Sequence, residues 1–178
     1  SQSLVALDPE RPEWQSELAW GQHNMAVLDM DRSQFGDASA GFLGELATLK
    51  KLAGTKPAEN QLQVRIADTT SFLGALAERE GRYSEALGRF KNQTQMLEAM
   101  VKNEPQNALW QERLSNAIAL EASVLEITGD RANALAGRKE ARRLLEILVA
   151  QNASNRVWLC ALFKLRLQEA ALGRANSD

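Results

Sequence analysis

A period of 48 residues runs through this sequence and restricts its fold more than any other feature. Five columns of similar residues share this step: Trp14, Leu62, Trp110 and Trp158; Leu18, Ile66, Leu114 and Leu162; Pro9, Pro57 and Pro105; Ala26, Gly74, Ala122 and Ala170; Ala38, Ala86 and Ala134. A fixed period of about 20–50 residues is the signature of stacked structural repeats, each of which buries its apolar face against the next. The columns therefore predict a repeat array.

The segments between the turn-forming residues have helical patterns. Leu62, Ile66 and Leu73, for example, recur at the spacing of one helix face. The alternation of Val, Ile and Thr that indicates strands is absent from the sequence. We expect an all-α fold of seven antiparallel helices, at 10–31, 35–54, 58–80, 83–103, 106–128, 131–151 and 155–173.

Breaks in the helical pattern fall at matching positions of each repeat. Gly81 and Gly129 lie in one column with Ser33 and are expected to end helices in the left-handed conformation. The prolines are expected to open the helix that follows, where a missing N–H costs little. These breaks divide the chain into a tail of an earlier repeat at 1–8, repeats at 9–56, 57–104 and 105–152, and a half repeat or capping helix at 153–178. The tail indicates an excised part of a longer array.

Charge and composition exclude several classes of function. The 21 Lys and Arg residues against 23 Asp and Glu residues leave a net charge of −2, which offers no electrostatic footprint for nucleic acid. No stretch approaches the roughly 18 consecutive apolar residues of a membrane-spanning helix. We expect a cytoplasmic protein with no nucleic-acid partner and no membrane insertion, although a segment of a larger extracytoplasmic protein stays open as an alternative.

The columns resemble the tetratricopeptide repeat, in which a small residue in the first helix is followed by Ala-x-x-x-Phe in the second helix and then by proline. Two sets follow this order: Ala26, Ala38, Phe42 and Pro57; Gly74, Ala86, Phe90 and Pro105. The family's repeat has about 34 residues. The extra length here divides into about seven residues per helix, which adds almost two turns and hardly rotates the buried face. The resemblance implies a right-handed superhelix, an α-α solenoid of helix pairs.

The run from Pro105 to Leu114 is similar to long repeats in large bacterial signalling and regulatory proteins. This resemblance implies a non-catalytic scaffold for protein–protein interaction, which binds a peptide or partner protein in a concave groove. Carried over from the family, the groove is lined by Trp20, His23, Val27, Met30, Asp68, Ser71, Ala75, Glu78, Asn116, Ala119 and Ser123. Spacings of three and four keep these residues on one face of each helix. The alternative is a regulatory sensor domain that binds a small molecule or the tail of the parent protein.

Residues that could support catalysis are sparse. His23 is the single histidine, and no group of His, Cys, Asp and Glu has the spacing of metal ligands. No Gly-rich phosphate loop follows a strand. We therefore expect no catalytic residues, no metal and no cofactor in this segment. The clamp with which some family members hold a C-terminal carboxylate is not expected either, since its positions include Val27, Phe72 and Leu120.

The tryptophans divide into two kinds by column. Trp14, Trp110 and Trp158 share a column with Leu62, so we expect them to be core residues. Trp20 lies in a column that is otherwise polar, with Asp68, Asn116 and Lys164. We expect Trp20 to face water.

The last helix, at 155–173, has no following helix to pack against. Its leucines are Leu159, Leu162, Leu165 and Leu172. Part of this apolar face is expected to be exposed, or to be covered in a homodimer that forms through the terminal helices.

The third repeat departs from the first two in two columns at once. Phe42 and Phe90 give way to Arg138, while Met25 and Leu73 give way to Glu121 and then to Glu169. We expect an ion pair between Arg138 and Glu121, with Glu169 as the rival partner. Such a pair is more readily explained as a structural bridge than as a chemical site.

Overall fold

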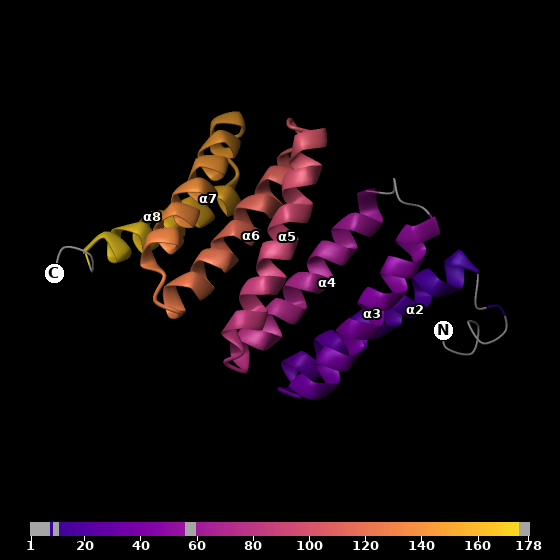
Figure 1. The fold of residues 1–178 in the computed structure, drawn as a ribbon. Coiled ribbons are helices and arrows are strands. Elements are labelled where there is room, and N and C mark those ends of the chain that lie inside the picture. The colour runs from indigo at the N-terminus through magenta and orange to yellow at the C-terminus, as the bar shows by residue number, and fades with distance from the viewer. Residues whose placement is uncertain (1–7, 9–10, 56–59, 175–178) are drawn as a thin grey trace. The chain divides into compact units, whose positions relative to one another are not determined.

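The computed structural model describes residue 8, residues 11–55 and residues 60–174. These residues form seven α-helices: α2 (Pro12–Asp31), α3 (Phe35–Thr55), α4 (Asn60–Arg79), α5 (Tyr83–Asn103), α6 (Ala108–Ile127), α7 (Arg131–Gln151) and α8 (Arg156–Arg174) (Figure 1). The expected all-α class is confirmed, and each helix end lies within two residues of its predicted position.

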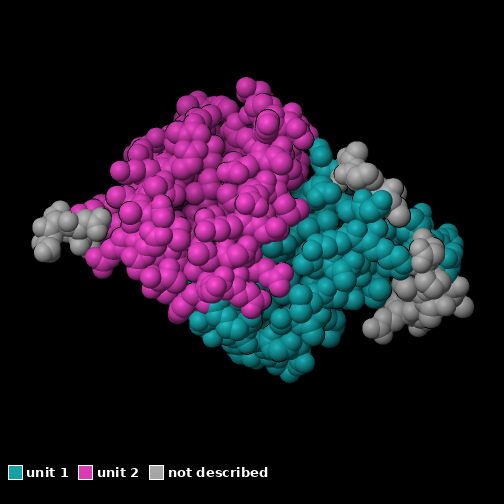
Figure 2. Space-filling view, viewed as in Figure 1, with its two compact units in different colours: residues 1–82 teal, residues 83–178 magenta. Residues whose placement is uncertain are grey.

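The chain folds into two compact units, residues 1–82 and residues 83–178 (Figure 2). In the first unit α3 packs against both α2 and α4. In the second unit α6 packs between α5 and α7, and α8 packs against α7. Within each unit, helices that follow each other in the sequence are neighbours in space, as expected for a helical repeat array. The predicted second repeat contributes α4 to one unit and α5 to the other.

The turns between paired helices repeat with the same geometry. Ser33, Gly81 and Gly129 have φ angles of 62°, 73° and 88°. The residue after each of them donates its N–H to a carbonyl five residues back in the helix, with 2.8 Å between the nitrogen and the oxygen in all three turns. This is the left-handed helix ending that the glycine column predicts, and it is confirmed in the turn that contains serine as well.

The small-residue columns are buried, and in two repeats they lie at a close contact between the paired helices. Ala26, Ala38, Ala86, Ala122 and Ala134 are at most 1% exposed, and Gly74 is buried. A Cβ atom added to Gly41 would lie 2.8 Å from Cβ of Ala26. One added to Gly137 would lie 3.2 Å from Cβ of Ala122. The first and third repeats therefore use the same tight contact between their two helices.

One expectation about helix starts is wrong for Pro105. This proline lies three residues before α6, and Asn107 caps the helix instead. The side-chain oxygen of Asn107 accepts hydrogen bonds from the backbone N–H of Leu109 at 3.1 Å and of Trp110 at 3.3 Å. An asparagine before the helix accepts hydrogen bonds from N–H groups of the first turn, which a proline side chain cannot do. Pro12 does occupy the first turn of α2, whereas Pro9 and Pro57 lie outside the described residues.

The tryptophans of the shared column are less uniform than expected. Trp158 is buried, at 9% exposed, but Trp14 and Trp110 are half-buried. The guanidinium of Arg11 lies over the ring of Trp14, 4.7 Å from its centre. The indole N–H of Trp110 donates to the carboxylate of Glu104 at 3.2 Å. The polar partners of Trp14 and Trp110 lie where these two rings are open to solvent, whereas Trp158 of the same column is covered.

Candidate functional site

The predicted groove stripe divides between the two units. Its α2 and α4 residues lie in the first unit, and its α6 residues lie in the second. Val27, Met30, Asp68, Ser71 and Glu78 are all half-buried. Each part of the stripe is described within its own unit.

In the first unit Trp20 is 51% exposed, as its polar column predicts. The guanidinium of Arg65 on α4 lies over its indole, 4.9 Å from the ring centre. His23, one turn further along α2, meets Trp20 edge-on, with 6.1 Å between the ring centroids. A cation held over an aromatic face stabilises both side chains. Trp20 is therefore an exposed ring in a fixed position.

A buried carboxylate organises the residues behind Trp20. Glu45 on α3 has a side chain that is only 2% exposed. It accepts a hydrogen bond from Nδ1 of His23 at 2.9 Å and one from the guanidinium of Arg65 at 3.3 Å. The ring of His23 also packs edge-on against Phe42 and Phe72, at centroid distances of 5.8 and 5.4 Å. Glu45 thus fixes both the histidine and the arginine that touch Trp20.

Sequence reasoning missed Glu45 and Arg65. The signal that could have found Glu45 is its column, which continues with Gln93 and Ala141. Gln93 is buried as well, at 6% exposed. A charged residue at a position that is buried in other repeats needs a partner of opposite charge, because an unpaired buried charge is costly. Arg65, on the next helix, is such a residue.

In the second unit, Asn116 and Ser123 line a real hollow between α6 and α8. Its volume is about 350 Å³. The lining residues are Ser115, Asn116, Ala119, Leu120, Ser123, Leu145, Ala161, Lys164, Leu165 and Gln168. Leu145 and Leu165 are buried at its base, while Asn116 and Lys164 are exposed. The hollow therefore has an apolar base and opens to solvent past polar side chains.

A second hollow, of about 560 Å³, adjoins the first and shares Ser123 with it. Its wall includes Arg138 of α7, a charged residue that is only 3% exposed. Arg138 donates to the side-chain oxygen of Gln168 at 2.5 Å and also forms an ion pair with Glu126. Because Gln168 lines the first hollow, the hydrogen bond between Arg138 and Gln168 joins the two hollows.

The expected partners of Arg138 are wrong. Glu121 accepts a hydrogen bond from the Thr94 hydroxyl at 3.3 Å, and Glu169 pairs with Nε of Arg142 at 2.9 Å. The carboxylate that Arg138 uses, Glu126, lies more than one turn further along α6 than Glu121. The long arginine side chain runs along the helix interface to reach it.

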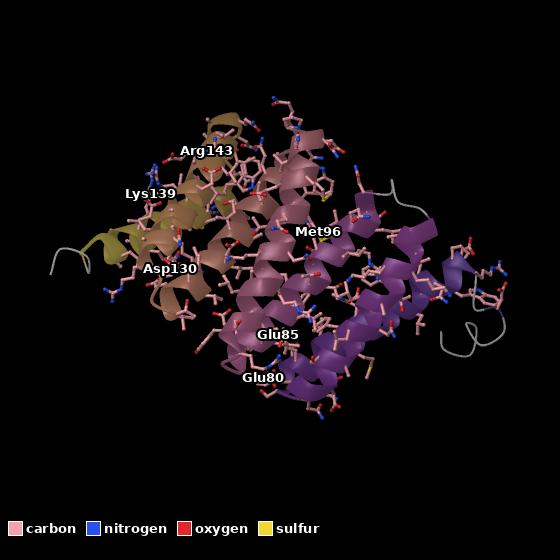
Figure 3. The ribbon with its side chains drawn as sticks, in the orientation of Figure 1. Glu80, Glu85, Met96, Asp130, Lys139 and Arg143 are labelled. Atoms are coloured by element: carbon pink, nitrogen blue, oxygen red, sulfur yellow. The ribbon has the colours of Figure 1, made fainter. Side chains whose placement is uncertain are left out.

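On another side of the second unit, a hollow of about 500 Å³ is acidic. Asp130, at the start of α7 in Figure 3, lines it together with Glu98, Glu121 and Glu140 and a single cation, Lys91. Burial raises the pKa of Glu121 above its ordinary value of 4.5, against the smaller opposing effects of Lys91 and Thr94. This carboxyl holds its proton more tightly than an exposed one.

Among the residues described, no group of three or more His, Cys, Asp or Glu side chains could hold a metal ion. No described helix is both long enough and apolar enough to cross a membrane. Comparison with models of known protein families gives no match, and comparison with curated proteins gives none either. The likeness to the tetratricopeptide repeat therefore depends on the repeated residues and on the packing of neighbouring helices.

Proposed function

We propose that this protein is a tetratricopeptide-like binding module, which works without catalysis and holds a peptide segment of a partner protein between α6 and α8. The observation that carries the proposal is the hollow of about 350 Å³ at Asn116 and Ser123. Both residues belong to the stripe that the resemblance to the tetratricopeptide repeat implies for the groove. An apolar base with polar groups at the rim is the usual composition of a recognition site.

The polar groups around the hollow indicate how a peptide would be held. The side chains of Asn116 and Lys164 are exposed at the rim and can reach the carbonyl groups of an extended backbone. The apolar base at Leu145 and Leu165 suits one aliphatic or aromatic side chain. In this proposal the protein belongs to a larger regulatory protein, as the family resemblance implies.

A second candidate is a sensor domain for a small molecule. The volume of the hollow lies in the range of about 300–1,000 Å³ that small-molecule sites occupy. Exposure of Asn116 and Lys164 favours the peptide, because an extended backbone can continue past these side chains into solvent.

The test is selection of binders from a peptide library against the purified protein, followed by calorimetry with the selected peptides. Replacing Asn116→Trp blocks the rim and is expected to weaken binding at least tenfold. The matched control is Asn92→Trp, since Asn92 is an exposed helical asparagine of the same unit that lines none of the three hollows. A library without enrichment, or peptides that bind both variants equally, would count against the proposal.

A further inference from the structure

One face of α8 exposes an apolar stripe. Leu159, Phe163 and Leu167 follow each other at four-residue spacing and are 41%, 65% and 57% exposed. Leu162, Leu165 and Leu172, which were expected on the uncovered face, are instead buried at 7%, 5% and 3%. The uncovered face of α8 therefore shares only Leu159 with the expected one.

The repeat columns show which face of α8 this is. Phe163 occupies the column of Ala19 on α2 and Ser115 on α6, which are 0% and 1% exposed. The hydroxyl of Ser115 donates to the backbone oxygen of Ala141 on α7 at 2.8 Å. The exposed stripe therefore corresponds to the face that α2 and α6 turn toward their paired helices.

A helix that covers this face of α8 cannot approach it as closely as the paired helices approach α2 and α6. In the same columns, Ala19 and Ser115 are small, whereas Phe163 is large. A backbone at the distance of α7 from Ser115 would collide with the phenylalanine ring. The face suits a helix that lies further away and accepts a ring between its side chains.

The charged residues beside the stripe restrict further which surface can cover α8. Arg156 and Arg166 are exposed beside the stripe, and Arg166 pairs with Glu146 of α7. Glu169, the single carboxylate of α8, is half-buried and bound to Arg142. Two such faces would bring like charges together, so pairing of α8 with α8 is disfavoured. The occupant should present apolar side chains together with carboxylates.

The face of α2 that carries Trp20 and Leu28 has this composition, apart from the guanidinium of Arg65 that lies over Trp20. Trp20 and Leu28 are 51% and 47% exposed, and the carboxylates of Glu17 and Asp31 are exposed beside them. Gly21 and Asn24 stand between these two residues in the sequence and are smaller than either, so we expect a low area there. A helix with larger side chains at these two positions would offer no space for a phenylalanine ring.

We propose that α8 of one molecule docks antiparallel on α2 of a second copy, in a head-to-tail contact. With Arg156 opposite Asp31, the spacings along the two helices agree: Leu159 meets Leu28, and Leu167 meets Trp20. Phe163 then enters the low area at Asn24 and Gly21. The contact leaves α2 free on one molecule and α8 free on the other, so assembly continues unless a ring closes.

Sedimentation velocity over a series of protein concentrations tests this proposal. The mass is expected to rise with concentration from the 19.6 kDa monomer to its multiples. Phe163→Glu and Leu28→Glu, each at an exposed position, should both remain monomeric. The matched control is Leu43→Glu on α3, at a leucine that is 46% exposed, and it should associate like the parent.

Mixing the two monomeric variants identifies the faces. Phe163→Glu keeps an intact α2 face, and Leu28→Glu keeps an intact α8 face, so the mixture should form a dimer that does not grow further. The proposal is overturned if the parent stays monomeric, including the case in which it binds vesicles of anionic lipid instead. It is equally overturned if Leu28→Glu associates like the parent, or if the mixture stays monomeric.

Discussion

Phe42 of α3 and Arg138 of α7 occupy the same position in the first and third repeats, one in each unit. Phe42 is fully buried, and its ring stacks on Phe72 with 4.8 Å between the centroids. Arg138 is 3% exposed and donates to Gln168. In both cases the partner lies 30 residues further along the chain.

The two contacts lie at the same positions of the repeat, but one is apolar and the other is polar. The repeat determines which side chains meet, because the contact between these two columns is kept when phenylalanine gives way to arginine. The neighbouring columns then determine whether the contact is apolar or polar. Glu126, the carboxylate that pairs with Arg138, falls in the column of Met30. Glu78 of the second repeat already has a carboxylate in this column, so it is relative to the first repeat that the charge of Arg138 is matched by two changed neighbours, Glu126 in place of Met30 and Gln168 in place of Phe72.

The largest effect is expected from Phe42→Arg, which places the charge of the second unit in the first. Phe72 and Met30 offer no acceptor at the positions of Gln168 and Glu126, and the nearby carboxylate of Glu45 is already bound to His23 and Arg65, so the buried guanidinium has no carboxylate of its own. The free energy of unfolding should fall by about 3–5 kcal/mol, as measured by urea denaturation. The control Leu43→Arg, at an exposed neighbouring position, should change it by less than about 0.5 kcal/mol. Similar losses for both variants would break the comparison.

Removing the carboxylate in the second unit should have the next largest effect. Glu126→Ala leaves the guanidinium of Arg138 with Gln168 alone, at a cost of about 2–3 kcal/mol. We expect a cost at the lower end of this range because the Glu126 side chain is 40% exposed. Glu140→Ala is the control, since Glu140 pairs with the exposed Arg143, and should cost less than about 1 kcal/mol. Equal costs in urea denaturation would show that burial of Arg138 does not matter.

The positions of the seven helices and the packing of sequence neighbours could be predicted from the sequence, because both follow from the spacing of the repeated residues. Helix ends, the left-handed residues and the small-residue contacts all follow from columns that recur at a fixed step. The partners of Arg138 could not be predicted in this way. Columns show which residues change together, but Glu121 and Glu126 both lie on α6, and side-chain reach decides between them.

The cluster around Glu45 escaped prediction for a related reason. Gln93 and Ala141 stand in its column, so the column can indicate a buried position but not the partners of a carboxylate placed there. Its partners, His23 and Arg65, come from two different helices. Three residues from three helices meet only once packing is known.

A smaller difference between the repeats lies in their turns. Ser33 has a φ of 62°, a conformation that costs a residue with a side chain roughly 1 kcal/mol. Ser33→Gly should therefore raise the free energy of unfolding by about 0.5–1 kcal/mol, whereas Gly129→Ala, at a φ of 88°, should lower it by about 1 kcal/mol. Thermal unfolding of both variants checks the signs. Changes in the same direction would contradict the shared turn geometry.

The smallest effect concerns pH. Met25 on α2 is 57% exposed, whereas Glu121 in the same column of α6 is half-buried, and burial raises its pKa above the ordinary value of 4.5. The folded state then binds this proton more tightly than the unfolded state, so its stabilising effect is present at low pH. That effect is lost as the pH rises through the raised pKa.

Glu121→Gln should remove this pH-dependent part of the stability. Urea denaturation at several pH values from about 4 upwards should show the parent losing stability relative to the variant as the pH rises. Parallel stability profiles for the two proteins would show that burial of Glu121 has no energetic consequence.

The most direct test of the account is to give the second unit the residues of the first at all three positions. The variant combines Glu126→Met, Arg138→Phe and Gln168→Phe, and its free energy of unfolding is measured beside that of Glu126→Met alone. We predict that the single change costs about 2–3 kcal/mol, while the triple variant stays within about 1.5 kcal/mol of the parent. A triple variant as unstable as the single one would contradict the claim that the repeat positions carry the contact.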